Sequence, residues 1–185
     1  HHGNGTEREF YGERGVLYFS VHQSPAYPGT GWVSDTGWGE GEGYTVNVPL
    51  PPGTGDEGYR RVFSRVLRPV ALRYRPELVI VSAGQDAHFA DPLGSMRVTV
   101  RGFGAMAAET RDLARETAGG RVVVLLEGGY HLQALAHSVL AILNEMAGLG
   151  LEVSDPAPPL GEAPADMVED RIAAVRRVHG DRWRL

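Results

Sequence analysis

The chain contains no cysteine, and this absence excludes several kinds of chemistry. Disulfide bonds, thiolate metal ligands and a cysteine nucleophile all need a residue that the sequence does not have. An excess of basic residues is also absent: 18 Lys and Arg stand against 23 Asp and Glu, which gives a net charge of -5. We therefore expect no nucleic-acid partner, because such a surface is normally basic.

Long hydrophobic runs are absent as well. No apolar segment approaches the ~20 residues that a membrane-spanning helix needs, so we expect no membrane partner and a cytoplasmic location. The 185 residues suffice for one domain with a sizeable core, and a hydrophobic content of 42% is ordinary for a globular protein.

Three short apolar runs rich in β-forming residues predict buried strands, at 16–21, 78–81 and 122–126, and the alternating segment 44–48 predicts another strand. Apolar residues at helical spacing predict helices over 59–74, with a kink at Pro69, and over 100–117 and 132–147. From residue 151 a Pro/Ala-rich connector leads to a last amphipathic segment, 167–178, which we expect to pack back as a peripheral helix. This alternation of strands and helices predicts an α/β fold with a parallel sheet.

Polar, glycine-rich loops follow the predicted strands. We expect the long Gly/Pro/Trp-rich segment 22–43 to be an ordered loop that lines a functional site. Because ligands bind beyond the carboxyl ends of parallel strands, we expect these loops to converge at one edge. Their polar residues include Ser20, His22, Asp86, Asp91 and Tyr130.

Each of these residues also has an ordinary structural explanation. Asp86 could cap a helix, His22 could be a hydrogen-bonded core histidine, and Tyr130 could be a packing residue. Taken together, His and Asp on strand-end loops favour a divalent metal site, and a tyrosine on a Gly-Gly turn could polarise a carbonyl group. The residues alone therefore suggest a metal-dependent hydrolase. The "GEGEG" segment precedes a strand, so it lacks the helix that a phosphate loop needs.

Five ordered segments carry a resemblance to a known family: "HHGNGT", "SVHQSPAYPGTG", "YTVNVPLPPGTGD", "LVIVSAGQDAHFADPLG" and "LLEGGYHLQALAHSV". Over residues 1–148 the chain resembles the zinc-dependent histone deacetylases of the arginase/deacetylase superfamily. Within them it is most similar to class II and bacterial class II-like amidohydrolases, including acetoin-utilisation-protein-like members. The resemblance implies a three-layer parallel sheet with flanking helices. Residues 1–150 would form the C-terminal part of a catalytic domain, followed by a connector and terminal helix over 151–185.

The resemblance also implies roles for individual residues. His1 and Asp86 match two zinc ligands, and Tyr130 matches the catalytic tyrosine that polarises the substrate carbonyl. The substrate-binding positions are Tyr27 at the acyl-lysine tunnel wall, Leu93 at its mouth and Gly129 beside the acyl chain. Asn4 matches a residue that orients a catalytic histidine. A structural potassium ion is implied beside Ser20, and a second beside the carbonyls of Phe10 and Val16. His2 is interpreted as structural, and Asp91 as a turn residue.

The implied function is zinc-dependent hydrolysis of N-acetyl amides, with acetyl-lysine or a small acetylated amine as substrate. In the family a third zinc ligand and a histidine pair precede the position of His1. We therefore expect the missing N-terminal part of the same domain to be the chain's partner, and the chain alone to be inactive. The alternatives are an inert fragment that acts as a binding module and, remotely, a nucleotide-binding domain. Polyamine-selective members carry an acidic residue at the position of Leu93, which favours acetyl-lysine peptides here.

Overall fold

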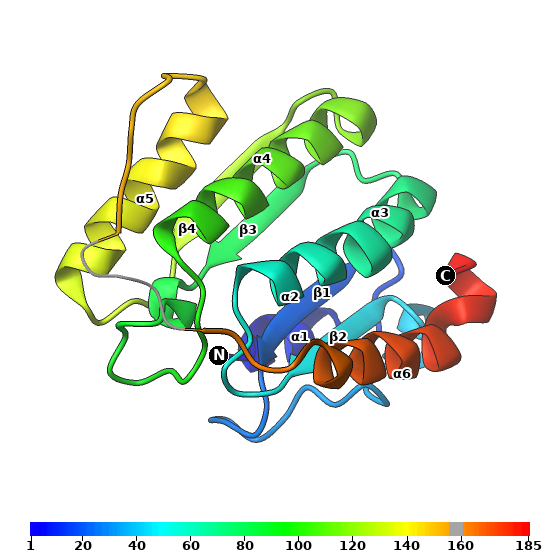
Figure 1. Ribbon diagram of the computed structural model, residues 1–185. Helices are drawn as coiled ribbons and strands as arrows, with labels where there is room; N and C mark the ends of the chain where they lie inside the picture. The colour runs from blue at the N-terminus through cyan, green and yellow to red at the C-terminus, as the bar shows by residue number, and fades with distance from the viewer. Residues whose placement is uncertain (156–160) are drawn as a thin grey trace.

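The computed structural model of the chain describes residues 1–155 and 161–185 (Figure 1). Strand β1 (Tyr18–Gln23) pairs in parallel with β2 (Thr45–Leu50), and β3 (Val79–Ala83) pairs in parallel with β4 (Val122–Leu126). The predicted strands and their parallel arrangement are confirmed, although β1, β2 and β3 lie one or two residues further along the chain than predicted.

Helices cover the strands and join the two strand pairs. In Figure 1, α2 (Asp56–Val62), α3 (Arg68–Tyr74) and α4 (Val100–Thr117) lie in front of the strands, and α5 (Leu132–Ala147) packs beside α4. Helices α4 and α5 have the predicted bounds. The short helix α1 (Asn4–Phe10), which contacts β1, was not predicted because Gly3, Asn4 and Gly5 resemble a turn.

A π-helical turn at Phe63–Leu67 connects α2 to α3, so the predicted single helix is continuous but not regular. In this turn the amide of Arg68 donates to the carbonyl of Phe63, five residues earlier. Pro69 follows directly, and a proline cannot donate a backbone hydrogen bond and crowds the carbonyl four residues before it. The wider π turn is a usual way to relieve such an interruption.

The last helix, α6 (Ala165–Trp183), is longer than the predicted segment 167–178, and the expectation that it is peripheral is wrong, because its apolar face is part of the core. Its buried residues Val168, Ile172 and Val175 pack with β2, α2 and α3. At its end, the indole Nε1 of Trp183 donates to the carbonyl of Gly43 over 2.9 Å. Residues 156–160 of the predicted connector lie outside the described residues.

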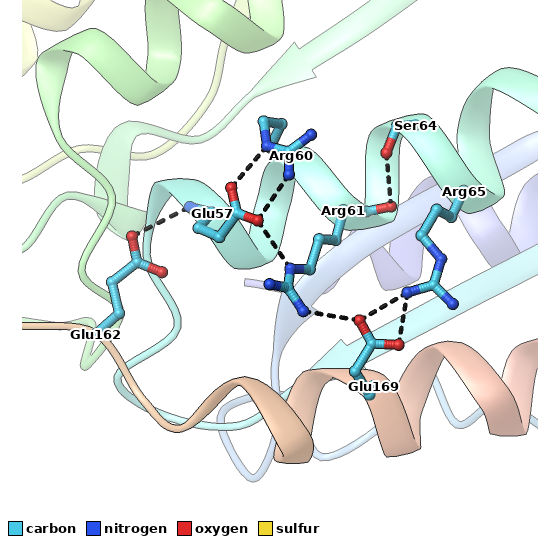
Figure 2. Close-up of polar contacts among 7 residues, drawn as sticks. All are labelled: Glu57, Arg60, Arg61, Ser64, Arg65, Glu162 and Glu169. Carbon is cyan, nitrogen blue, oxygen red and sulfur yellow. Dashed lines mark hydrogen bonds and ion pairs between the residues drawn. The ribbon is translucent and has the colours of Figure 1, made fainter.

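Arginine–glutamate contacts hold α6 against α2 and the π turn (Figure 2). Glu169 on α6 lies 2.9 Å from Arg61 and 2.5 Å from Arg65, and the arginine hydrogen bonds lower the pKa of Glu169. These side chains are about one-third exposed. Exposed ion pairs contribute little, typically ~0–1 kcal/mol each, so the apolar face of α6 dominates its attachment.

The hydrophobic core lies between β2 and the helical layer. Its fully buried residues come from several elements and include Val46, Val48, Leu50, Val62, Val66, Val70, Val98 and Ile172. The partly buried Val124 of β4 packs against the same core, so both strand pairs share it. Within the described residues, no helix is long and apolar enough to cross a membrane.

Truncating Ile172 tests whether α6 belongs to the cooperative core. We expect Ile172→Ala to lower the free energy of unfolding by about 2–5 kcal/mol, because Ile172 has no exposed surface. Val178→Ala is the matched control on the same helix, where the side chain is half-exposed and the change should stay within ~0.5 kcal/mol. Denaturant unfolding of both purified variants measures the difference. Equal, small effects would show that α6 is not part of the folded unit.

Candidate metal centre and carbonyl-binding turn

The loops after β3 and β4 meet because these two strands are neighbours in register. Ala83 lies opposite Leu126, and the amide of Glu127 donates to the carbonyl of Ala83 over 3.1 Å. One step further, the amide of Gln85 donates to the carbonyl of Gly128 over 2.8 Å. The predicted convergence of strand-end loops is thus present for the loops that carry Asp86 and Tyr130.

Asp86 lies in a 3-10 turn, Gln85–Ala87, and its buried carboxylate faces His1. Oδ2 of Asp86 contacts Nδ1 of the His1 imidazole, and the His1 backbone nitrogen lies 3.3 Å from the same oxygen. The N-cap position of this turn is occupied by Gly84 and not by Asp86, which disfavours the capping interpretation.

The paired donors of His1 and Asp86 fit a divalent metal by their chemistry. Imidazole nitrogen and carboxylate oxygen are both zinc ligands, and catalytic zinc usually has three protein ligands and one open position. In residues 1–155 and 161–185, no group of three or more His, Cys, Asp or Glu side chains gathers at one point. The described part of the chain therefore supplies two candidate ligands.

The Gly128-Gly129 turn brings the backbone before Tyr130 against Asp86. A Cβ atom at Gly128 would lie 3.0 Å from Cγ of Asp86, closer than an ordinary contact, so glycine lets the turn approach the carboxylate without displacing it. Gly129 has a φ of +137°, and a Cβ there would lie 2.9 Å from Leu135 and 3.1 Å from Gln85. The side chain of Tyr130, which follows this turn, is 55% exposed.

Asp91 contacts this turn from the other loop, which its interpretation as a turn residue did not predict. Its Oδ2 accepts from the amide of Tyr130 over 2.7 Å, and its Oδ1 accepts from the amide of Leu93 over 2.9 Å. The second contact is the expected local turn, whereas the first joins residues 39 positions apart. Sequence offers no signal for such a contact between loops.

A buried polar network lies next to His1. His2 Nδ1 is 2.8 Å from Thr30 Oγ1, and His2 Nε2 is 3.3 Å from the Glu7 carboxylate, which also accepts from Asn47 over 2.6 Å. Burial lowers the pKa of His2, although Glu7 opposes this shift. These contacts support a structural role for His2. Glu7 and Asn47 were not singled out from the sequence, because no pattern shows that a residue before the first predicted strand meets one inside the strand predicted at 44–48.

His22 is a hydrogen-bonded core histidine, as one interpretation of the sequence expected. Nδ1 lies 2.9 Å from Ser20 Oγ, and Nε2 lies 3.0 Å from the carbonyl of Gly31. Burial, together with neighbouring His2, lowers the pKa of His22 to about 4, so this ring is neutral at pH 7. The hydroxyl of Ser20, at one expected potassium position, thus contacts His22.

The remaining expected site residues do not gather at one point. Phe10 and Val16 flank the turn after α1, where the Phe10 carbonyl accepts from the amide of Glu13 over 3.0 Å. The ring of Tyr27 is 80% exposed, and its centroid is 6.4 Å from that of His1, so it borders the candidate metal centre. Leu93 is also exposed, and Asn4 is an exposed residue at the start of α1.

Comparisons with known proteins give one consistent result. The histone deacetylase domain matches residues 1–146. A "Probable deacetylase" of Archaeoglobus fulgidus is 42% identical over 193 residues, covering 100% of this chain and 54% of the relative. "Histone deacetylase 14, chloroplastic" of Arabidopsis thaliana is 42% identical over 182 residues, covering 97% of this chain and 43% of the relative.

Among solved structures, the HDA15 HD domain superposes with a TM-score of 0.86 at 36% identity, covering 100% of this chain and 49% of that one. The chain therefore spans about half the length of the proteins that it matches.

A methyl group at Gly129 tests the backbone of the Tyr130 turn. We expect Gly129→Ala to destabilise the fold by about 1–3 kcal/mol, because alanine rarely adopts a φ of +137° and its Cβ would crowd Leu135. Gly5→Ala in α1 is the control, since its Cβ would meet nothing within 4 Å and alanine favours helix. Thermal unfolding compares the two variants. An unchanged midpoint for Gly129→Ala would contradict the described turn.

Proposed function

Because the chain belongs to the histone deacetylase family, we propose that it forms the part of a deacetylase domain that binds zinc and polarises the substrate carbonyl. The observation that carries this proposal is the junction of two loops. One brings Asp86 against His1, and the other places the Tyr130 turn directly beside Asp86. The reaction is hydrolysis of an N-acetyl amide, in which water adds to the carbonyl carbon, the C–N bond breaks, and acetate and an amine are released.

The proposed roles follow from the chemistry of each side chain. His1 and Asp86 would hold zinc, which supplies a Lewis acid and a more acidic water when it is bound. The hydroxyl of Tyr130 would donate a hydrogen bond to the carbonyl oxygen, whose negative charge grows as the tetrahedral intermediate forms. Tyr27, at the border of the site, would form one wall of the acyl channel.

We propose that a third zinc ligand and the general base come from residues outside these 185. The described residues gather two candidate ligands, and the matched relatives are about twice as long. One face of the β3–β4 pair supports the same proposal. Ile80, Val123 and Leu125 on it are largely exposed, whereas parallel sheets are normally covered on both faces. The rest of the domain would cover this apolar face, and the 185-residue chain alone would be inactive.

Removing the Asp86 carboxylate tests the zinc site. In the complete protein, we expect Asp86→Ala to lose most bound zinc, because one ligand of a three-ligand site is removed. Asp112→Ala is the control, since Asp112 is an exposed partner of Arg111 far from this junction. Metal analysis of both purified variants measures zinc per chain. Full occupancy in Asp86→Ala would show that Asp86 is not a ligand.

Removing the Tyr130 hydroxyl tests carbonyl polarisation separately from zinc binding. We expect Tyr130→Phe to keep zinc but to lower kcat on an acetyl-lysine peptide by on the order of 10²-fold, the usual effect of losing an oxyanion donor. Tyr74→Phe is the control, because the Tyr74 hydroxyl donates to Gly15 and serves the fold. Unchanged turnover in Tyr130→Phe would exclude the role. A zinc-loaded wild type without any turnover would favour the binding-module alternative.

We propose acetyl-lysine peptides over acetylpolyamines as substrates, on the basis of Leu93. Its exposed, uncharged side chain offers no charge pairing to a second ammonium group of a polyamine. In Leu93→Glu, the ratio of kcat/KM for acetylspermidine to kcat/KM for the peptide should rise. Leu93→Gln is the control, because it adds a polar side chain without adding a charge. A ratio that is unmoved in a folded, zinc-loaded Leu93→Glu protein would show that Leu93 does not select the substrate.

A further inference from the structure

We propose that Asp91 is a positioning residue that holds the backbone of Tyr130 in place and couples it to the Leu93 loop. This inference rests on the proposed function, because it assigns Asp91 a role through the tyrosine that polarises the carbonyl. Asp91 lies outside the set of residues that the zinc or the substrate would touch.

The two contacts of Asp91 use both oxygens of its carboxylate. The amide of Tyr130 donates to Oδ2 over 2.7 Å, and the amide of Leu93 donates to Oδ1 over 2.9 Å. Both are backbone donors, so the contacts fix the path of the chain and leave the side chains of Tyr130 and Leu93 free. A hydrogen bond to an ionised acceptor is roughly twice as strong as a neutral one, which suits a contact that joins two loops.

The surroundings of Asp91 indicate that the two backbone amides hold its carboxylate in place. Its exposed fraction is 7%, and it forms no ion pair with any residue in the described part of the chain. A buried carboxylate is costly unless its oxygens are hydrogen-bonded. The amides of Tyr130 and Leu93 supply those hydrogen bonds, so the carboxylate and the two loops stabilise one another.

Tyr130 depends on this contact more than a core tyrosine would. More than half of its side-chain surface is exposed, so packing alone does not fix the ring. The preceding Gly129, at a φ of +137°, has no side chain of its own to anchor the turn, although Leu135 and Gln85 lie against its backbone. The hydrogen bond from the Tyr130 amide to Asp91 and the hydrogen bond from Gln85 to Gly128 both restrain the backbone segment that carries the Tyr130 side chain.

Hydrogen exchange tests the contact without relying on activity. In the complete, zinc-loaded protein, we expect the Tyr130 amide to exchange about 10-fold faster or more in Asp91→Asn and Asp91→Ala, the effect of losing a hydrogen bond to a charged acceptor. The matched control is Asp166→Asn, because Asp166 also accepts from a backbone amide but lies at the exposed start of α6. Unchanged exchange at Tyr130 in both Asp91 variants would overturn the proposal.

A double-mutant cycle tests whether Asp91 acts on turnover through Tyr130. On an acetyl-lysine peptide we expect Asp91→Asn to lower kcat by ~10-fold with little change in zinc content, because small misplacements of a catalytic group have effects of this size. In the Tyr130→Phe background the same substitution should change kcat by less than ~2-fold, since coupled residues are not additive. Asp91→Ala should show the same pattern, with a larger decrease in kcat when Tyr130 is present.

The outcomes separate this inference from the proposed function. Equal effects of Asp91→Asn in both backgrounds, or a loss of zinc that matches the loss of kcat, would assign Asp91 a general structural role and overturn the proposal. A zinc-loaded wild type without turnover would refute the proposed function and with it the role of Asp91 in catalysis. In that case faster exchange at the Tyr130 amide would still establish the contact.

Discussion

The parallel pairing of β3 with β4 is the constraint on which the candidate site depends. Because Ala83 lies opposite Leu126, the two strands end at the same level, and their loops leave the sheet side by side. Two hydrogen bonds then continue the contact beyond the sheet, from Glu127 to Ala83 and from Gln85 to Gly128. A slip of one residue in this register would move Asp86 relative to the Tyr130 turn, so the strand pairing sets the geometry of the candidate site.

The sequence was informative wherever structure depends on local pattern. Helices α4 and α5 and strand β4 have the bounds that periodicity and apolar runs predict, because their signals extend over whole elements. Strand β1 begins later than predicted, since pairing starts where the amide of Tyr18 meets the carbonyl of Tyr44, and Leu17 packs on the core without joining the strand. The first residue of a strand therefore depends on where its partner strand begins to pair with it.

The candidate site was predictable in its residues but not in its contacts. Motif order identified His1, Asp86 and Tyr130 as the residues of interest, and the loop junction brings their segments together. The hydrogen bond from Tyr130 to Asp91 and the burial of Glu7 beside His2 arise from tertiary packing. A single sequence carries no trace of either, because a turn aspartate and a helix glutamate look the same wherever they lie.

The two candidate ligands are attached to different strand pairs, and this division makes the candidate metal centre dependent on the core. His1 precedes α1 and lies beside the network that joins His2 and Glu7 to Asn47 of β2, whereas Asp86 follows β3. No described strand bridges the two pairs, so their relative position is set by the helices packed across both. Closely packed interiors transmit small shifts instead of absorbing them. The distance between the His1 and Asp86 donors therefore follows from how α2, α3 and α4 pack, and the contacts that stabilise the fold also set the geometry of the candidate metal centre.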